Sequence, residues 1–160
     1  MFMLSIEKIT NDNWKNYKNL QVTVEQARMT GDTQDIPNVY FALEIMAYYA
    51  FDNSYNLFGF LYDTTPVGFC SYLFAPIIGN ISGKQCLITS IMIDKNFQSK
   101  KFGTEGLKLL IKYIKQNHGV DKIFAYVEPD NNPAKNLCLK SGFVLYENDY
   151  DSILTYVLTC

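Results

Sequence analysis

A short loop between two apolar segments carries residues suited to binding an anion. The loop, Asn96–Thr104, follows an apolar run over Cys86–Asp94 that predicts a strand, and it precedes Glu105–Gln116, whose apolar spacing predicts an amphipathic helix. Backbone N–H groups at a helix start lack partners within the helix, and the helix dipole favours negative charge there. With Lys100 and Lys101 beside them, these amides predict a pyrophosphate site. An ordinary turn with solvated lysines is the alternative, since neither glycine-rich phosphate-binding pattern occurs here.

A second group of polar residues follows the next predicted strand, Lys122–Val127. Asp130 or Asn131 suits the cap of a helix, and Pro133 suits its first turn, where a missing N–H costs nothing. Gly142 marks the end of this helix. The sequence therefore places a second strand, turn and helix directly after the first.

One face of this second helix has an unusual composition. Asn131, Ala134, Lys135 and Cys138 fall at i, i+3, i+4 and i+7, so they share a face. That face combines an amide, a small residue, a cation and a thiol, where a structural helix more often has an apolar stripe. This composition is unusual for a purely structural helix.

Together the two segments resemble the GNAT superfamily of acetyl-CoA-dependent N-acetyltransferases. The loop resembles the family pattern Q/R-x-x-G-x-G/A, matching at Gln98 and Gly103 and departing at Lys101. The order and spacing of the two segments also agree with the family.

The second helix is similar to the family pattern N-x-x-A-x-x-L-Y-x-x-x-G-F. It departs at Cys138, where tyrosine is usual. The matching positions are Asn131, Ala134, Leu137, Gly142 and Phe143.

The resemblance implies a site for acetyl-CoA. The backbone of Ile91–Ile93 would pair with the pantetheine arm, and the N–H of Met92 or Ile93 would polarise the thioester carbonyl. Lys135 would meet the 3′-phosphate, or else be a solvated lysine. The residues expected to bind the coenzyme are Ile91, Met92, Ile93, Gln98, Ser99, Lys100, Lys101, Phe102, Gly103, Thr104, Asn131, Ala134, Lys135 and Cys138.

Acid and base groups are less clear in the sequence. Cys138 stands where the family has a tyrosine that protonates the leaving thiolate, so it is a packing residue, a substitute acid or a mark of lost catalysis. Tyr126 lies nearby in sequence and could supply a hydroxyl instead. Glu128 could deprotonate the amine, or be a solvated carboxylate. His118 ends a predicted helix, which favours a structural role.

The acceptor is suggested by the resemblance alone. Asn13, Trp14, Gln26 and Asn38 in the front half look like the bacterial spermine/spermidine and diamine acetyltransferase branch. A polyamine or diamine is therefore the leading amine. The alternatives are another amine (an aminoglycoside, an amino acid or a protein N-terminus), or a catalytically silent protein that binds acyl-CoA.

Composition and charge set limits on the function. The 160 residues are 48% hydrophobic and 19% charged, which predicts one folded domain over residues 1–160. A net charge of −2 argues against nucleic-acid binding. The four cysteines show no metal spacing, so no metal is expected. No signal sequence or membrane span is recognised, so we expect a cytoplasmic protein. The aromatic pair Tyr48 and Tyr49 suggests a possible homodimer.

The order of predicted elements gives the fold class. Strands come first and a β-α-β-α-β series follows, which predicts an α/β (mixed α+β) protein. We expect the GNAT fold, with a mostly antiparallel sheet of about seven strands flanked by about four helices. The expected strands are Met3–Lys8, Asn56–Tyr62, Val67–Phe74, Cys86–Asp94, Lys122–Val127, Val144–Glu147 and Ile153–Leu158; the expected helices begin at Asn11 or Asp12, at Val39, at Glu105 and near Asn131.

Overall fold

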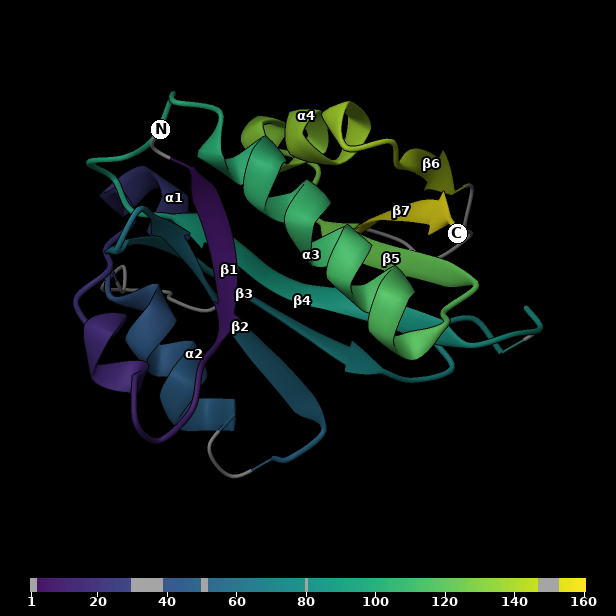
Figure 1. Ribbon diagram of the computed structural model, residues 1–160. Helices are drawn as coiled ribbons and strands as arrows, with labels where there is room; N and C mark the ends of the chain where they lie inside the picture. The colour runs from purple at the N-terminus through teal and green to yellow at the C-terminus, as the bar shows by residue number, and fades with distance from the viewer. Residues whose placement is uncertain (1–2, 30–38, 50–51, 80, 147–152) are drawn as a thin grey trace.

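The computed structural model describes residues 3–29, 39–49, 52–79, 81–146 and 153–160. Within them the chain forms strands and helices in nearly the expected order (Figure 1). The strands are β1 (Leu4–Lys8), β2 (Tyr55–Tyr62), β3 (Thr65–Phe74), β4 (Gln85–Ile93), β5 (Lys122–Val127), β6 (Val144–Tyr146) and β7 (Leu154–Thr159). The α-helices are α1 (Val24–Arg28), α2 (Phe41–Tyr49), α3 (Phe102–His118) and α4 (Asn132–Lys140).

The strands form one 7-stranded sheet in the order β1-β2-β3-β4-β5-β7-β6. Among the described pairs, β4 and β5 run parallel and the others antiparallel. Helix α3 supplies the crossover between the two parallel strands and lies across one face of the sheet, with α4 beside it (Figure 1). The expected class, a mixed α/β fold with a mostly antiparallel sheet, is confirmed.

Two apolar clusters hold the helices against opposite faces of the sheet. Successive strand residues point to opposite faces. On β3, Phe69 therefore packs with Ala27 of α1 and Met46 of α2, whereas Cys70 packs in the cluster that contains α3. Burying apolar side chains on both faces fixes the register of β3 and β4 at the centre of the sheet.

The first expected helix is wrong in type and length. Only a 3-10 helix forms, over Trp14–Asn16, and the chain reaches its next helical turn at α1. The reason is local, because the Asn13 side chain accepts from the N–H of Thr10 and donates to the carbonyl of Lys8, which closes a turn instead of capping a helix. Helix α1 begins at a capping box of Thr23 and Gln26, which the sequence analysis did not identify.

The remaining elements differ from expectation at their ends. Helix α3 begins at Phe102, three residues before the expected Glu105, so Gly103 lies in its first turn. The turn between β2 and β3 takes only Asp63 and Thr64, with Asp63 at φ 60°. Expected features at residues 30–38, 50–51 and 147, which include Asn38 and Glu147, lie outside the described residues.

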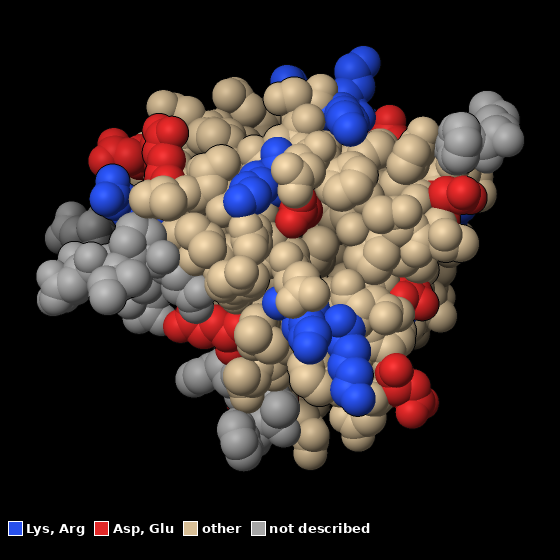
Figure 2. Space-filling model, turned by 90° about the vertical axis from the view of Figure 1, so that its left-hand side faces the viewer, with Lys and Arg blue, Asp and Glu red and all other residues tan. Residues whose placement is uncertain are grey.

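Charged side chains are scattered on the side of the molecule that carries α1 and α2. Figure 2 shows lysines, arginines and acidic residues interspersed in a mostly uncharged surface. In the part of the chain that the structure describes, no helix is both long and apolar enough to cross a membrane.

Candidate coenzyme site

The start of α3 presents backbone amides that no side chain caps. Its N-cap, Lys101, makes no side-chain cap hydrogen bond, and the first helical bond joins the N–H of Glu105 to the Lys101 carbonyl at 3.0 Å. The N–H groups that come before Glu105 in the first turn therefore have no partner within the helix. Helices α1 and α4 differ, because Thr23 caps α1 and the Asn131 side chain accepts from the N–H of Ala134 at 3.1 Å. The start of α3 can therefore accept an anion.

The loop before α3 has a backbone shape that concentrates N–H groups. Ser99 and Lys101 have φ values of 63° and 66°, in the left-handed region that residues other than glycine seldom adopt. Residues that alternate between right- and left-handed conformations turn successive N–H groups toward one side and form an anion-binding concavity. Lys101 occupies the position where the family pattern has glycine.

Strands β4 and β5 diverge next to this loop. Their pairing runs from Gln85↔Lys122 to Ile88↔Ala125, so the rest of β4 is not hydrogen-bonded to β5. The Asp94 N–H donates to Val67 at the β3 side, at 2.9 Å. Because the direction of the backbone groups alternates along a strand, the N–H of Met92 also points to β3. The N–H groups of Ile91 and Ile93 point into the gap between the diverging strands.

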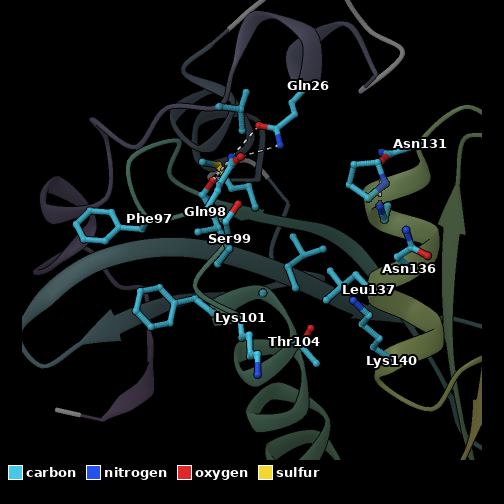
Figure 3. A pocket seen from close by; sticks show the side chains of 18 of the residues that line it. Gln26, Phe97, Gln98, Ser99, Lys101, Thr104, Asn131, Asn136, Leu137 and Lys140 are labelled. Carbon is cyan, nitrogen blue, oxygen red and sulfur yellow. Dashed lines mark hydrogen bonds between the residues drawn. The ribbon is translucent and has the colours of Figure 1, made fainter.

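A cavity of about 590 Å³ lies beside the end of β4, and no described residue of β5 lines it. It is open to solvent and bordered by the end of β4, the loop, the start of α3, α4, and residues in and beside α1 (Figure 3). Its described lining contains two lysines, Lys101 and Lys140, and no carboxylate, so its electrostatics suit a phosphate ligand. The expected coenzyme residues that line it are Ile91, Met92, Ile93, Gln98, Ser99, Lys101, Phe102, Gly103, Thr104, Asn131 and Ala134.

Three expected coenzyme residues do not line the cavity. The Lys100 ammonium lies 5.1 Å from the centre of the Phe97 ring. The Lys135 ammonium donates to the carbonyl of Pro129 at the start of α4. Cys138 is only 5% exposed and packs in the apolar cluster beneath α3 and α4.

The environments of the three expected catalytic side chains differ. Burial raises the pKa of the Cys138 thiol to about 11, so the thiol is protonated at neutral pH. Tyr126 lies on β5 and is 48% exposed, and burial of the remainder raises its pKa. Glu128 follows β5, is exposed, and accepts from the N–H of Asn131 through its carbonyl. None of the three is among the residues that line the described cavity.

Several residues that line the cavity were not predicted from the sequence. On α4 the face toward the cavity is that of Ala134, Leu137 and Lys140, whereas the expected face included Lys135 and Cys138. The i, i+3, i+6 spacing of these three was a usable signal. The lining residues not expected from the sequence are Val22, Gln26, Met29, Phe97, Pro133, Asn136, Leu137 and Lys140.

Gln26 and Gln98 form a direct link across the cavity wall. Their side-chain amides exchange hydrogen bonds of 3.1 and 2.8 Å (Figure 3). Gln98 also donates to the carbonyl of Ile93 at 2.9 Å.

Among the described residues, no group of three or more His, Cys, Asp or Glu side chains could hold a metal ion.

Comparison with known proteins identifies the family of this arrangement. The family model described as acetyltransferase (GNAT) family matches residues 13–143. No curated protein matches the chain at a significant level.

Solved structures share the fold at low sequence identity. A spermidine N-acetyltransferase from Vibrio cholerae, in complex with CoA and spermine, has a TM-score of 0.68 and 16% identity, over 98% of this chain and 95% of that one. Aminoglycoside acetyltransferase AAC(6′)-Ib, in complex with coenzyme A, has a TM-score of 0.71 and 16% identity over the same shares. An acetyltransferase from Salmonella typhimurium that modifies the N-terminal serine of ribosomal protein L7/L12 has a TM-score of 0.68 and 14% identity, again over 98% and 95%.

Proposed function

Because the chain belongs to the GNAT acetyltransferase family, we propose that it transfers the acetyl group of acetyl-CoA to a primary amine, with a polyamine or diamine as the leading acceptor. Family membership confirms the expected enzyme class, an acetyl-CoA-dependent N-acetyltransferase. The observation that carries the coenzyme assignment is the uncapped start of α3 facing a cavity lined by lysines and no described carboxylate.

The residues around the cavity fit the phosphates of the coenzyme. The first-turn amides of α3 and the left-handed positions Ser99 and Lys101 would hold the pyrophosphate. Gly103 leaves room for it, since a Cβ there would meet only Leu137 and Ile93 at 3.6 and 3.7 Å. Lys101 at the start of α3 and Lys140 on α4 both line the cavity and would supply positive charge.

The gap beside β4 fits the pantetheine arm. Acetyl-CoA would present its acetyl group as a thioester. A neutral amine would attack the carbonyl carbon, the C–S bond would break, and the CoA thiolate would leave and take up the proton that the amine loses. The outward N–H groups of Ile91 and Ile93 would donate to the arm and to the carbonyl oxygen as negative charge develops on it. We assign the polarising role to Ile93 rather than Met92, because the N–H of Met92 points to β3.

Three side chains, Cys138, Glu128 and Tyr126, are the candidates for the acid and base of the reaction. The Cys138 thiol keeps its proton at neutral pH and lies in the core, which supports a packing role. Glu128 remains the proposed base, acting directly or through water, and Tyr126 the alternative hydroxyl. The buried thiol also supports the second candidate function, a catalytically silent acyl-CoA-binding protein.

The acceptor, location and oligomeric state belong to the same proposal. The similarity to a spermidine acetyltransferase supports a polyamine, while the similarities to an aminoglycoside acetyltransferase and to an enzyme acting on a protein N-terminus keep those acceptors as alternatives. A cytoplasmic location remains expected. A homodimer through Tyr48 and Tyr49 remains a proposal. The Tyr49 ring stacks on the Tyr55 ring, with the ring centroids 3.7 Å apart, and the Tyr48 side chain lies outside the described atoms.

The test combines turnover with binding. Release of the coenzyme thiol from acetyl-CoA would be measured with spermidine, spermine, putrescine, an aminoglycoside, free amino acids and an N-terminal peptide, and coenzyme binding would be measured by calorimetry. We expect coenzyme binding and turnover with at least one polyamine. Binding without turnover on any amine would favour the silent binder, and absence of binding would refute the site.

A further inference from the structure

Gln26 joins a segment of the front half of the protein to the coenzyme loop. It lies in the short helix α1, and its side-chain amide faces that of Gln98, 72 positions away in the sequence. Gln26 donates to Oε1 of Gln98 at 3.1 Å, and Gln98 donates to Oε1 of Gln26 at 2.8 Å (Figure 3). Such a reciprocal pair constrains both side chains more than a single hydrogen bond would.

Each partner of this pair is also anchored to its own segment. Nε2 of Gln98 gives its second hydrogen bond to the carbonyl of Ile93, the last residue of β4, at 2.9 Å. Oε1 of Gln26 accepts from the N–H of Thr23 at 3.2 Å, within the capping box of α1. An unbroken series of hydrogen bonds therefore runs from the first turn of α1 to the end of β4.

The donors of Gln98 are fully used in this arrangement. An amide nitrogen carries two protons, and those of Gln98 go to Gln26 and to Ile93. The side chain of Gln98 therefore shapes the loop and is not free to donate to a phosphate. The phosphate-facing groups are the backbone amides that follow it.

A second tie holds the same two segments together. The buried carboxylate of Asp94 accepts from the N–H of Gln21 at 2.8 Å, and the N–H of Lys95 donates to the carbonyl of Gln21 at 2.8 Å. The loop residues between Asp94 and Gln98 are thus fixed at both ends by the front segment. Left-handed residues follow directly, at Ser99 and Lys101, where a local energetic cost must be offset by surrounding contacts.

We propose that Gln26 is a positioning residue for coenzyme binding, holding the anion-binding loop in its active shape through Gln98. This inference rests on the proposed function of the site. Without Gln26, the Gln98 amide loses its partner, and the loop gains conformations that must be frozen again when the coenzyme binds. Coenzyme affinity falls, although Gln26 acts through another residue.

A double-mutant cycle tests the proposal. Gln26→Met and Gln98→Met keep side-chain length and remove the hydrogen bonds, with Gln26→Ala as a second variant at the same site. We expect each single substitution to raise the coenzyme Kd about tenfold, as for loss of one or two net hydrogen bonds, and the double variant to be no weaker than the weaker single variant. Gln116→Met, on an exposed part of α3, is the matched control and should bind normally.

The readouts separate positioning from folding. Urea unfolding of the coenzyme-free variants should show cooperative transitions with only a modestly lower midpoint in the Gln26 variants, since Gln26 also closes the capping box of α1. Weakened binding by variants that are fully folded places the loss in binding. Unchanged coenzyme affinity in a folded Gln26 variant, or strictly additive losses in the double variant, would overturn the inference while leaving the proposed function intact. Absence of coenzyme binding by the unaltered protein would refute the proposed function itself, and this inference with it.

Discussion

Two residues distinguish this site from the pattern of its family. Lys101 stands at a glycine position with φ 66°, and Cys138 stands at a tyrosine position. The first adds a cation to the wall of the cavity and carries backbone strain. The second removes a hydroxyl and buries a thiol whose pKa is raised to about 11. Each departure predicts a measurable effect.

Replacing Lys101 with glycine should weaken coenzyme binding without lowering the free energy of unfolding. Removing the Cβ relieves about 1 kcal/mol of left-handed strain, partly offset because glycine makes the unfolded chain more flexible. We expect the free energy of unfolding to stay the same or rise slightly, and the coenzyme Kd to rise about fivefold from the lost cation. Urea titration and calorimetry measure the two quantities, with the exposed Lys112→Ala as control. An unchanged Kd would remove Lys101 from the site.

Replacing Cys138 with alanine should affect stability more than turnover. The thiol is 5% exposed and packs beneath α4, so its loss leaves a small cavity that costs roughly 1–2 kcal/mol. We expect kcat to fall by less than tenfold, and Cys160→Ala, at an exposed position, to change neither property. Thiol-release kinetics and urea unfolding provide the measurements. A loss of about a thousandfold in kcat would instead make Cys138 the proton donor.

At the scale of elements, α3 serves both the site and the core through two glycines one turn apart. Gly103 faces the cavity, with Leu137 and Ile93 the nearest groups to an added Cβ. Gly106 faces the sheet, where an added Cβ would lie 2.9 Å from the fully buried ring of Phe60. The helix start can therefore lie close to β4 at one position and close to β2 at the other.

Substitutions at these two glycines should have opposite consequences. Gly103→Trp fills the space proposed for the pyrophosphate, so we expect a folded protein whose coenzyme Kd rises more than about a hundredfold. Gly103→Ala should be tolerated, while Gly106→Ala should cost about 1–3 kcal/mol of stability through overpacking, despite better helix propensity. Calorimetry and urea unfolding distinguish the two effects. Normal coenzyme affinity in folded Gly103→Trp would disprove the placement.

At the scale of the whole molecule, the candidate site and the only histidine, His118, lie at opposite ends of α3. His118 ends the helix, its Nε2 lies 3.1 Å from the Tyr72 hydroxyl, and its carbonyl accepts from the Lys84 ammonium at 2.9 Å. Partial burial, then the charges of Lys84 and Lys8, lower the pKa of His118 below its usual value. The folded state therefore favours the neutral imidazole.

This arrangement predicts a pH dependence of stability. The unfolded chain binds a proton at His118 near pH 6.5 and the folded chain only at lower pH, so stability is present above pH 6.5 and declines as pH falls through the folded pKa. We expect the urea midpoint to fall between pH 7.5 and 5.5, and to fall less in His118→Gln, which can still bond to Tyr72. Identical declines in both proteins would contradict the assignment.

The sequence by itself predicted most elements and many of the residues that line the described cavity. The loop, β4 and the capped start of α4 were readable because their signals are local: apolar periodicity, a proline in a first turn and a cap at Asn131. The family resemblance added acetyl-CoA and the enzyme class. The prediction of the first helix was wrong because the Asn13 side chain closes a turn through hydrogen bonds to Thr10 and Lys8, and local composition does not determine which of the two structures forms.

Only the tertiary structure decided which side chains meet. It placed Lys140 rather than Lys135 at the cavity, buried Cys138, directed the N–H of Ile93 into the gap, and joined Gln26 to Gln98 across 72 positions. These facts depend on helix rotation, strand divergence and the packing of the front segment on β4. Each arises from contacts between residues distant in sequence, which local spacing does not encode.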